Sequence, residues 1–481
     1  MVWTALQKYS TMFISFISGI VLARLLAPYD YGCIGMLAIF MTLAEAFIDG
    51  GFGSALIQKK KPTQEDYSTI FFWNIGMAML MYAVLFFSAP AISRFYNIPL
   101  LCDVLRVQGL VLFIYAFNIV QRNQLKKKLN FKVLSIVTII TSLVSLGVTI
   151  FMAYNGFGVW ALVAQNLISA AIPAIVFWFF IKWRPIWAFS WASFKELFSF
   201  GFYMFLTNML NRFSQQLQGL LIGKFYNPTT MGYYSKAHGT EKLASLSISS
   251  VMMQVTYPLY AEVQDDKAQL GNIIRRITMT LSYITFPMLF ILLLCAKPIF
   301  VLLYSDRWLQ SVPYFQVLCI AGLAACLQSV NNQAIAAIGK SRAMFVWTIV
   351  KRTASIVLMV GGLATLGMKG LLGGLVISSW FTYFVNISLV SKFIGYKTGR
   401  QLLDILPVMV ASVISALAAY GVGQLLKLPM YPDGILKAAV YVVVYLGWSF
   451  IFKPESFNYF KTVIDPVMLI IKHKVSKDKQ S

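Results

Sequence analysis

Charged residues are scarce in this chain of 481 residues, and acidic residues are the scarcest of them. Asp, Glu, Lys and Arg together make up 12% of the sequence, whereas an average soluble domain has about 25%. Hydrophobic residues reach 59%, and the mean hydropathy is +0.72. These values exclude a soluble globular protein and indicate an integral membrane protein.

Cysteine is also sparse, and a nucleotide-binding motif is missing. The five cysteines lie in or beside apolar runs, without metal-ligand spacing or histidine neighbours: Cys33, Cys102, Cys295, Cys319 and Cys326. We interpret them as small core residues and predict no metal site. The sequence contains nothing that resembles a P-loop, which argues against direct use of ATP. The loops are short, and none could hold an independent soluble domain.

Long apolar runs fill the chain instead. Runs of about 20 residues, the length that crosses ~30 Å of hydrocarbon, occur about fourteen times. They lie near 4–26, 32–57, 67–89, 101–121, 133–153, 157–181, 196–222, 231–257, 276–296, 311–336, 343–366, 370–391, 404–426 and 434–452. We interpret the first run as a spanning helix rather than a cleaved signal peptide. The sequence therefore predicts an all-α membrane protein with about 14 transmembrane helices.

Basic residues concentrate in alternate loops, for example Lys59 to Lys61 and Arg122 with Lys126 to Lys128. Cytoplasmic loops carry such an excess, so these loops and both termini are predicted to be cytoplasmic. The formal net charge of +23 is then a signal of membrane orientation, and no nucleic-acid partner is expected. We interpret the basic clusters as orientation signals and lipid headgroup contacts rather than substrate ligands.

The chain looks duplicated. Arg24, Pro28 and Gly32 have the spacing of Lys224, Pro228 and Gly232, and Asn123-Gln124 matches Asn332-Gln333. Six spans per half predict two parallel repeats, with a further helix pair at the C-terminal end. The predicted domains are a six-helix bundle at 1–195, a second at 196–400, the helix pair at 401–452 and a basic cytoplasmic tail at 453–481.

Polar residues at membrane depth must face protein or water, because lipid does not satisfy them. Thr42, Glu45 and Asp49 share one helix face. The interior cations outnumber the acids, so we expect a cavity for an anionic cargo, with arginine suited to phosphate. The predicted substrate path comprises Arg24, Arg106, Arg212, Lys236, Lys242, Lys351 and Arg352. Arg106, Lys351 and Arg352 could instead snorkel to a membrane surface.

Four segments carry a resemblance to a known family: LARLLAPYDYGCIGMLAIF, DGGFGSALIQKK, YPLYAEVQDDKAQL and YSDRWLQSVPYFQVLCIAGL. Together they resemble the bacterial polysaccharide flippases of the Wzx type, nearest the colanic and teichuronic acid exporter branch of the multidrug/oligosaccharidyl-lipid/polysaccharide (MOP) exporter superfamily. The resemblance implies a flippase in the bacterial inner membrane that translocates an undecaprenyl-pyrophosphate-linked oligosaccharide for surface polysaccharide biosynthesis. The positions that match family signatures are Arg24, Asp49, Gln264, Asp265 and Asp266.

The expected mechanism is alternating access through a central cationic cavity, without enzymatic activity or a cofactor. Glu45, Asp49 and Glu241 are candidates for coupling to H⁺ or Na⁺. The expected partners are the lipid-linked glycan, membrane lipids and other polysaccharide-assembly proteins. Two alternatives stay open: a cation-coupled multidrug antiporter of the same superfamily, and a membrane polysaccharide polymerase or glycosyltransferase. Enzymes of the latter kind need a sizeable outer loop, and the longest one here, near 297–310, offers a single acid, Asp306.

Overall fold

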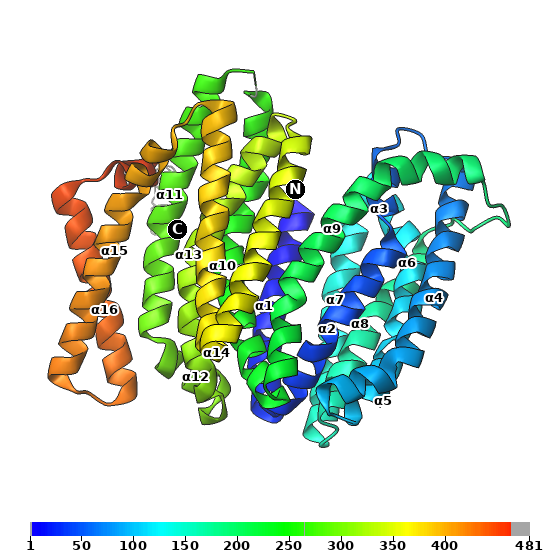
Figure 1. The fold of residues 1–481 in the computed structure, drawn as a ribbon, viewed down its shortest axis with the longest axis horizontal. Coiled ribbons are helices and arrows are strands. Elements are labelled where there is room, and N and C mark those ends of the chain that lie inside the picture. Colours follow the sequence, from blue (N-terminus) through cyan, green and yellow to red (C-terminus); the bar gives the residue numbers. More distant parts are fainter. Residues whose placement is uncertain (1, 264, 463–481) are drawn as a thin grey trace, which may run out of the picture. The chain divides into compact units, whose positions relative to one another are not determined.

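The computed structural model describes residues 2–263 and 265–462, and every regular element in that part of the chain is a helix (Figure 1). Eleven of these helices are long and apolar enough to cross a membrane. The two other predicted runs, 196–222 and 231–257, lie in two long, more polar helices. The two runs predicted at 343–391 lie in one element, counted once among the eleven, that reverses direction. The predicted all-α class is confirmed.

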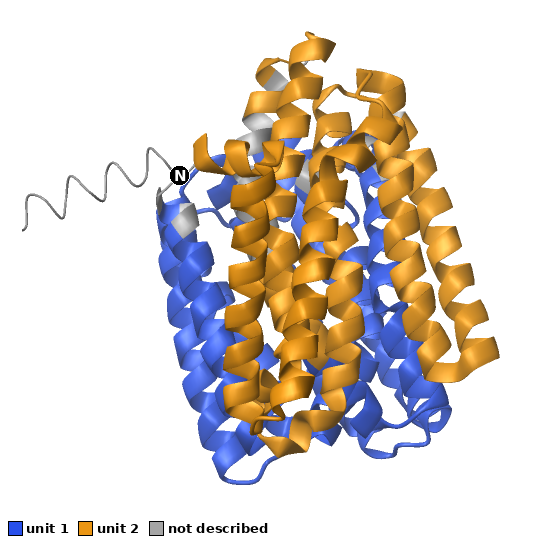
Figure 2. Ribbon diagram, turned by 90° about the vertical axis from the view of Figure 1, so that its left-hand side faces the viewer, with its two compact units in different colours: residues 1–236 blue, residues 237–481 orange. Residues whose placement is uncertain are grey.

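The chain divides into two compact units, Met1–Lys236 and Ala237–Ser481 (Figure 2). Unit 1 contains α1 (Val2–Leu25), α2 (Pro28–Asp49), α3 (Phe52–Gln58), α4 (Gln64–Tyr96), α5 (Leu100–Gln108), α6 (Leu110–Lys127), α7 (Phe131–Tyr154), α8 (Val159–Phe180), α9 (Trp191–Phe225) and the first turns of α10 (Pro228–Glu262). The helix α9 packs on α2 and α3, so it belongs to this unit. The boundary at residue 195 stays a prediction about the sequence repeats, which the division into compact units does not test.

Unit 2 contains the rest of α10, then α11 (Lys267–Leu294), α12 (Ala296–Tyr304), η1 (Asp306–Ser311), α13 (Val312–Ala337), α14 (Ser341–Ile394), α15 (Thr398–Leu426) and α16 (Met430–Phe452). The helix α13 packs on α11 and α14, and α15 packs on α11 and α16. The helix α14 reverses at Gly367, where φ is 58° and ψ is −136°, which accounts for the two spans predicted at 343–366 and 370–391.

Two predicted boundaries are corrected by the backbone. The run predicted at 32–57 is broken between α2 and α3, because Gly50 and Gly51 adopt left-handed conformations with φ of 53° and 77°. The segment predicted as an outer loop at 297–310 is mostly helical, and Trp308 in η1 is fully buried. Hydropathy gives the length of an apolar run but not the backbone dihedrals within it, so neither feature was predictable from composition.

Unusual backbone conformations recur at matching points of the two halves. Positive φ occurs at Asn97 after α4 and at Ser305 after α12, and again at Leu129 before α7 and at Gly339 before α14. The N-cap of α8, Gly158, has φ 54° and ψ −127°, close to the values at Gly367. Such conformations are uncommon outside glycine, so their recurrence in the same order supports the predicted duplication.

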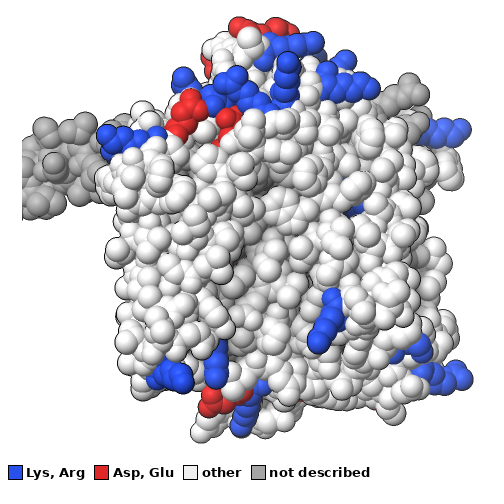
Figure 3. Space-filling view, turned by 60° about the vertical axis from the view of Figure 1, so that its left-hand side comes forward, with Lys and Arg blue, Asp and Glu red and all other residues white. Residues whose placement is uncertain are grey.

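The distribution of charge fits a chain that spans a membrane. On the face shown in Figure 3, the Lys, Arg, Asp and Glu side chains gather at the two ends, and the band between them is almost uncharged. Many apolar side chains on the helices are exposed, for example Phe87, Phe179 and Leu425. A soluble protein would bury such residues, whereas hydrocarbon accommodates them.

Candidate functional site

A cavity of about 860 Å³ with a mixed apolar and polar lining lies within unit 1, and residues from α1, α2, α3, α5, α6, α7 and α8 line it. Its volume falls in the range of small-molecule sites, about 300–1,000 Å³. The polar lining residues are Gln7, Thr42, Glu45, Gln108, Tyr115, Asn118, Arg122, Lys126, Thr138, Thr141, Ser142, Asn166 and Ser169. Many hydroxyl and amide groups of this unit are therefore part of the lining of one cavity.

A second cavity of about 210 Å³ shares part of this lining. Asn118, Arg122 and Lys126 line both cavities. These residues are spaced four apart on α6, so they project from one face of that helix. Asp49 from the end of α2 and Asn123 complete the polar wall of the smaller cavity.

Arg212 on α9 pairs with the polar face of α2. Its Nη1 donates to Glu45 Oε2 at 3.2 Å and to the Thr42 carbonyl oxygen at 3.1 Å. The side chains are partly exposed, 37% for Arg212 and 28% for Glu45. The structure thus brings together three residues that the sequence placed on polar faces. Arg212, which was predicted to line the substrate path, is thus paired with Glu45, which was predicted as a candidate for ion coupling.

Asp49 lies where α2 ends, with its carboxylate within reach of the backbone N–H groups of Gly51 and Gly53. A Cβ atom on Gly53 would lie 2.8 Å from Asp49 Oδ1 and 3.0 Å from Asn123 Nδ2. The glycine therefore leaves the space in which the carboxylate and the amide approach each other. This arrangement fixes the Asp49 side chain at the smaller cavity.

None of the predicted cations of unit 1, Arg212 included, is part of the lining of these two cavities. Lys236 is 8% exposed; its Nζ donates to the Gly19 carbonyl and lies 5.3 Å from the centre of the Tyr31 ring. The Arg106 guanidinium lies 4.4 Å from the centre of the Phe86 ring. Arg24 is exposed in the last turn of α1. Lys236 thus attaches the start of α10 to α1, whatever contact it makes with cargo.

Two of the four charged candidates in unit 2, Lys351 and Glu241, are buried against neighbouring helices. Lys351 is 7% exposed and donates to Asn386 Oδ1 at 2.8 Å. Glu241 is also 7% exposed, and Gly322 on α13 provides its space, because a Cβ there would lie 2.5 Å from Glu241 Oε1. Arg352 is half-buried, and Lys242 is exposed. Their contact with cargo or coupling ions stays a prediction.

Two of the family-motif residues, Asp265 and Asp266, directly precede α11. Asp266 caps this helix, since its Oδ1 accepts hydrogen bonds from the backbone N–H groups of Ala268 at 3.0 Å and Gln269 at 2.9 Å. Asp265 is exposed, and Gln264 lies outside the described residues. An aspartate directly before an apolar helix is a common N-cap, so part of this motif has a structural role.

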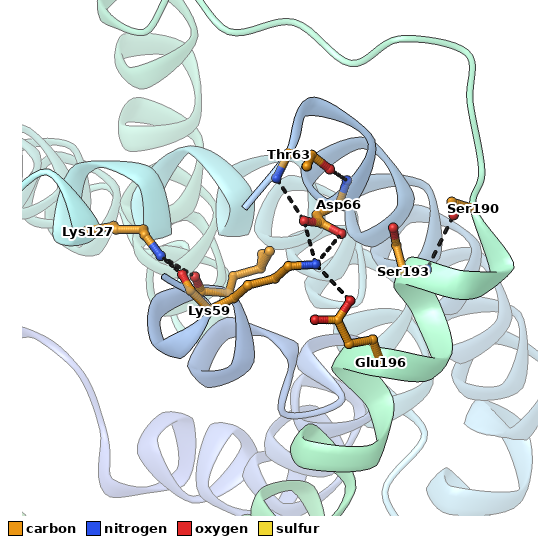
Figure 4. Close-up of polar contacts among 8 residues, drawn as sticks. Lys59, Thr63, Asp66, Lys127, Ser190, Ser193 and Glu196 are labelled. Atoms are coloured by element: carbon orange, nitrogen blue, oxygen red, sulfur yellow. Dashed lines mark hydrogen bonds and ion pairs between the residues drawn. The ribbon is translucent and has the colours of Figure 1, made fainter. Parts of the chain in front are cut away.

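Sequence reasoning missed Arg122 and Lys126 as cavity residues, because it interpreted the basic cluster as an orientation signal. The neighbouring Lys127 has a structural role, because its Nζ donates to the carbonyl oxygens of Leu56 at 3.0 Å and of Ile57 at 3.2 Å. It also donates to the carbonyl oxygen of Lys59, and Figure 4 labels these two lysines. The four-residue spacing of Asn118, Arg122 and Lys126 was the signal that could have identified their shared face.

Lys59 joins the ends of three helices beside this site (Figure 4). Its Nζ lies 3.0 Å from an oxygen of Asp66, at the start of α4, and 2.9 Å from Glu196 Oε2 on α9. The Asp66 side chain is 1% exposed and also accepts a hydrogen bond from the Thr63 N–H at 2.8 Å. The cluster holds α3, α4 and α9 together at one end of unit 1.

No three His, Cys, Asp or Glu side chains come together as metal ligands would within residues 2–263 and 265–462. All five cysteines are free thiols; four are buried and Cys102 is partly exposed. The cysteines thus behave as small, mostly buried core residues.

Comparison with known proteins identifies relatives over most of the chain. Residues 21–313 match the family described as polysaccharide biosynthesis protein. The chain is 25% identical to the teichuronic acid biosynthesis protein TuaB of Bacillus subtilis, over 82% of this chain and 80% of TuaB. It is 22% identical to the lipopolysaccharide biosynthesis protein WzxC of Escherichia coli, over 88% of this chain and 87% of WzxC.

Solved structures share the fold. The lipid II flippase MurJ, in an inward closed conformation, matches with a TM-score of 0.76 and 13% identity, over 94% of this chain and 99% of MurJ. An inward-facing multidrug resistance transporter of the MATE family, in the MOP superfamily, matches with a TM-score of 0.64 and 15% identity, over 80% of this chain and 94% of the transporter. At these identities the likeness concerns the fold.

Proposed function

Because the chain belongs to the polysaccharide biosynthesis protein family, we propose that it translocates an undecaprenyl-pyrophosphate-linked oligosaccharide across the bacterial cytoplasmic membrane. The resemblance to Wzx-type flippases is confirmed at the level of family and of the MOP-superfamily fold. The observation that carries the proposal is the combination of that family match with a fold shared with a lipid flippase. The product would serve the assembly of a surface polysaccharide.

The chemistry of such a cargo calls for three different surroundings. Its pyrophosphate needs cations, its sugars need hydrogen-bonding groups or water, and its polyprenyl tail is stable in hydrocarbon. In our proposal the first two parts cross by alternating access through a cationic cavity while the tail stays in lipid. The cavity of unit 1 supports this, because hydroxyls, amides and two cations are part of its lining.

In our proposal the orientation of the chain in the membrane follows from the charge distribution. Basic loops alternate along the sequence, so the positive-inside rule places both termini and the Lys126 end of α6 in the cytoplasm. The glycan lipid would enter there and leave at the outer leaflet. The chain would act as a transporter rather than as an enzyme, and proton or Na⁺ movement through Glu45, Asp49 or Glu241 would supply the driving force.

The test is export of a lipid-linked glycan by the full chain. In a strain that lacks its own flippase, the wild-type chain should restore surface glycan. Arg212→Ala and Lys242→Ala should each reduce that export, while Lys128→Ala, an exposed lysine on the same cytoplasmic side, should not. Unchanged export in both variants would contradict a cationic path, and failure of the wild type with every glycan tried would contradict the function.

A cation-coupled multidrug antiporter is the second candidate, because the fold likeness to a MATE family transporter accompanies two carboxylates, Glu45 and Asp49, at unit 1 cavities. Such a protein should export cationic dyes from cells or vesicles. Dye efflux that depends on Glu45 and Asp49, together with no effect on surface glycan, would favour this candidate over the flippase.

A further inference from the structure

Arg122 and Lys126 present two cations to both cavities of unit 1. They lie one helical turn apart on α6 and are exposed. Neither side chain forms a hydrogen bond or an ion pair with the residues that the structure describes, whereas Lys127 beside them is held by three carbonyl oxygens. Their donor groups are therefore free to bind a ligand.

The acids around this pair leave a local excess of positive charge. Glu45 lines the larger cavity and is paired with Arg212, and Asp49 is the carboxylate that lines the smaller cavity. Two cations thus face one carboxylate that lacks a close cation partner. Two guanidinium or ammonium groups at this spacing suit a ligand with more than one anionic oxygen, such as a phosphate or pyrophosphate.

The same cavity contains buried oxygen atoms without hydrogen-bond partners among the described residues. They are Gln108 Oε1, Asn118 Oδ1 and Thr141 Oγ1. Gln108 and Thr141 are each 5% exposed, and buried polar atoms are nearly always hydrogen-bonded. These three side chains line the wall around the larger cavity, and their oxygens are acceptors that the hydroxyl groups of a sugar could satisfy.

We propose that unit 1 carries a sugar-phosphate subsite of its own. Arg122 and Lys126 bind the phosphate groups at the end of α6, and Asn118 and Thr141 bind hydroxyls of the sugar attached to them. Gln108 precedes α6 and lies about 20 Å from Arg122 along the helix axis, so it binds a sugar further along the glycan. The inference rests on the proposed function and specifies which part of the cargo unit 1 recognises. The phosphate chemistry is shared by an ordinary phospholipid headgroup, which lacks the sugar.

Binding measurements on the full chain in nanodiscs test the phosphate part. The probes are undecaprenyl-pyrophosphate-linked N-acetylglucosamine, undecaprenyl pyrophosphate and phosphatidic acid. The double variant Arg122→Gln/Lys126→Gln should bind both pyrophosphate lipids about tenfold more weakly, and Lys128→Gln should bind them as the wild type does. Arg122→Lys/Lys126→Arg keeps both positive charges and should retain most of the affinity. It is the control for a folding defect, because it changes the same two positions without removing charge.

Thr141→Val tests the sugar part, because valine removes the hydroxyl with little change of shape. This variant should bind the sugar-bearing lipid about fivefold more weakly and undecaprenyl pyrophosphate unchanged. Thr149→Val on the same helix is the matched control, since Thr149 is buried but its hydroxyl already bonds the Ser145 carbonyl at 2.6 Å.

The outcomes separate this subsite from the function on which it rests. If the wild type binds and transports the lipid-linked sugar, but Arg122→Gln/Lys126→Gln binds it as tightly as Lys128→Gln does, the proposed subsite is wrong and the proposed function stands. Equal binding of phosphatidic acid and the sugar-bearing lipid, with no effect of Thr141→Val, would assign the cations to headgroup contact and overturn the sugar subsite. If the wild type binds neither pyrophosphate lipid, both proposals fail.

Discussion

Gly32 and Pro228 are in such close contact that a Cβ atom on the glycine would lie 2.5 Å from the Pro228 carbonyl carbon. The contact is reciprocated by the duplicated pair, since a Cβ atom on Gly232 would lie 2.6 Å from the Pro28 carbonyl carbon. Both contacts lie within unit 1, where the first turn of α2 meets the first turn of α10. The repeated Pro and Gly positions therefore lie where α2 and α10 cross, and each glycine contacts the proline of the other helix.

Gly32→Ala and Gly232→Ala should each destabilise the protein by about 1–3 kcal/mol, because the methyl group would meet backbone that cannot rotate away. Thermal unfolding of the purified protein in detergent would measure the loss. Gly147→Ala on α7 is the control, since a Cβ there would meet no atom within 4 Å apart from its chain neighbours and the backbone of its own helix. If Gly32→Ala and Gly232→Ala both unfold at the temperature of the wild type, the close contact between the two helices is contradicted.

Much of the fold was predictable from composition, because a membrane imposes a fixed length on every apolar segment. The fourteen apolar runs and the Pro28 and Gly32 repeat needed only hydropathy and spacing. The break at Gly50 and Gly51 and the helical segment around Trp308 were not predictable. They depend on backbone dihedrals and on packing against other helices, which a single sequence does not report.

The candidate site was predictable only in part. Thr42, Glu45 and Asp49 stood out because polar residues on one face of an apolar helix have few explanations. Arg122 and Lys126 did not, because cations near a helix end also serve as orientation signals. The partners of each side chain distinguish a cavity residue from an orientation signal, and a single sequence does not give them. The pair of Arg212 and Glu45, for example, joins residues far apart in the sequence.

The ion pair of Arg212 and Glu45 should be visible as energetic coupling between the two positions. Arg212→Ala should reduce glycan export more than Glu45→Gln does, since the arginine also holds the Thr42 carbonyl. The exchanged variant Arg212→Glu/Glu45→Arg should recover part of the stability that either single reversal loses. Thermal unfolding would measure this recovery, and strictly additive losses would contradict a direct pair.

The stability that Lys59 contributes should depend far more on its ion pair with Asp66 than on its ion pair with Glu196. Lys59→Met would leave the buried Asp66 carboxylate without its cation, at a cost of about 3–5 kcal/mol. Glu196→Gln should cost less than about 1 kcal/mol, because Glu196 is 61% exposed. Unfolding temperatures of the two variants test this order, and equal losses would contradict it.

The pH dependence of that cluster has a defined sign. Burial lowers the pKa of Lys59, but hydrogen bonds to Glu196 and Asp66 outweigh it and raise the pKa above its usual 10.5. The contribution of the cluster to stability should therefore be complete below pH 10.5 and decline as the pH rises through the raised value. Lys59→Met should lack this alkaline decline in an otherwise matched series of unfolding measurements.

A second buried network attaches α15 to α11 in unit 2. Arg275 contacts both oxygens of Asp404 at 2.8 Å, and Tyr396 donates to the same carboxylate at 2.6 Å. Arg275→Met should cost about 3–5 kcal/mol, since Asp404 is 8% exposed. Arg275→Met/Asp404→Leu should recover much of that loss, and a double variant no more stable than the single one would contradict the pairing.

Coupling to an ion gradient would act through carboxylates at membrane depth, and the structure gives the three candidates different surroundings. Glu45 already has a cation partner in Arg212, Asp49 lies beside backbone N–H groups at the smaller cavity, and Glu241 is buried against α13. A carboxylate that exchanges ions must lose and regain its charge during each cycle, and a fixed cation partner opposes that loss. We therefore expect Asp49→Asn and Glu241→Gln to reduce gradient-driven glycan transport in vesicles more than Glu45→Gln does. Transport that persists in the wild type after the H⁺ and Na⁺ gradients are both collapsed would remove the coupling hypothesis for all three.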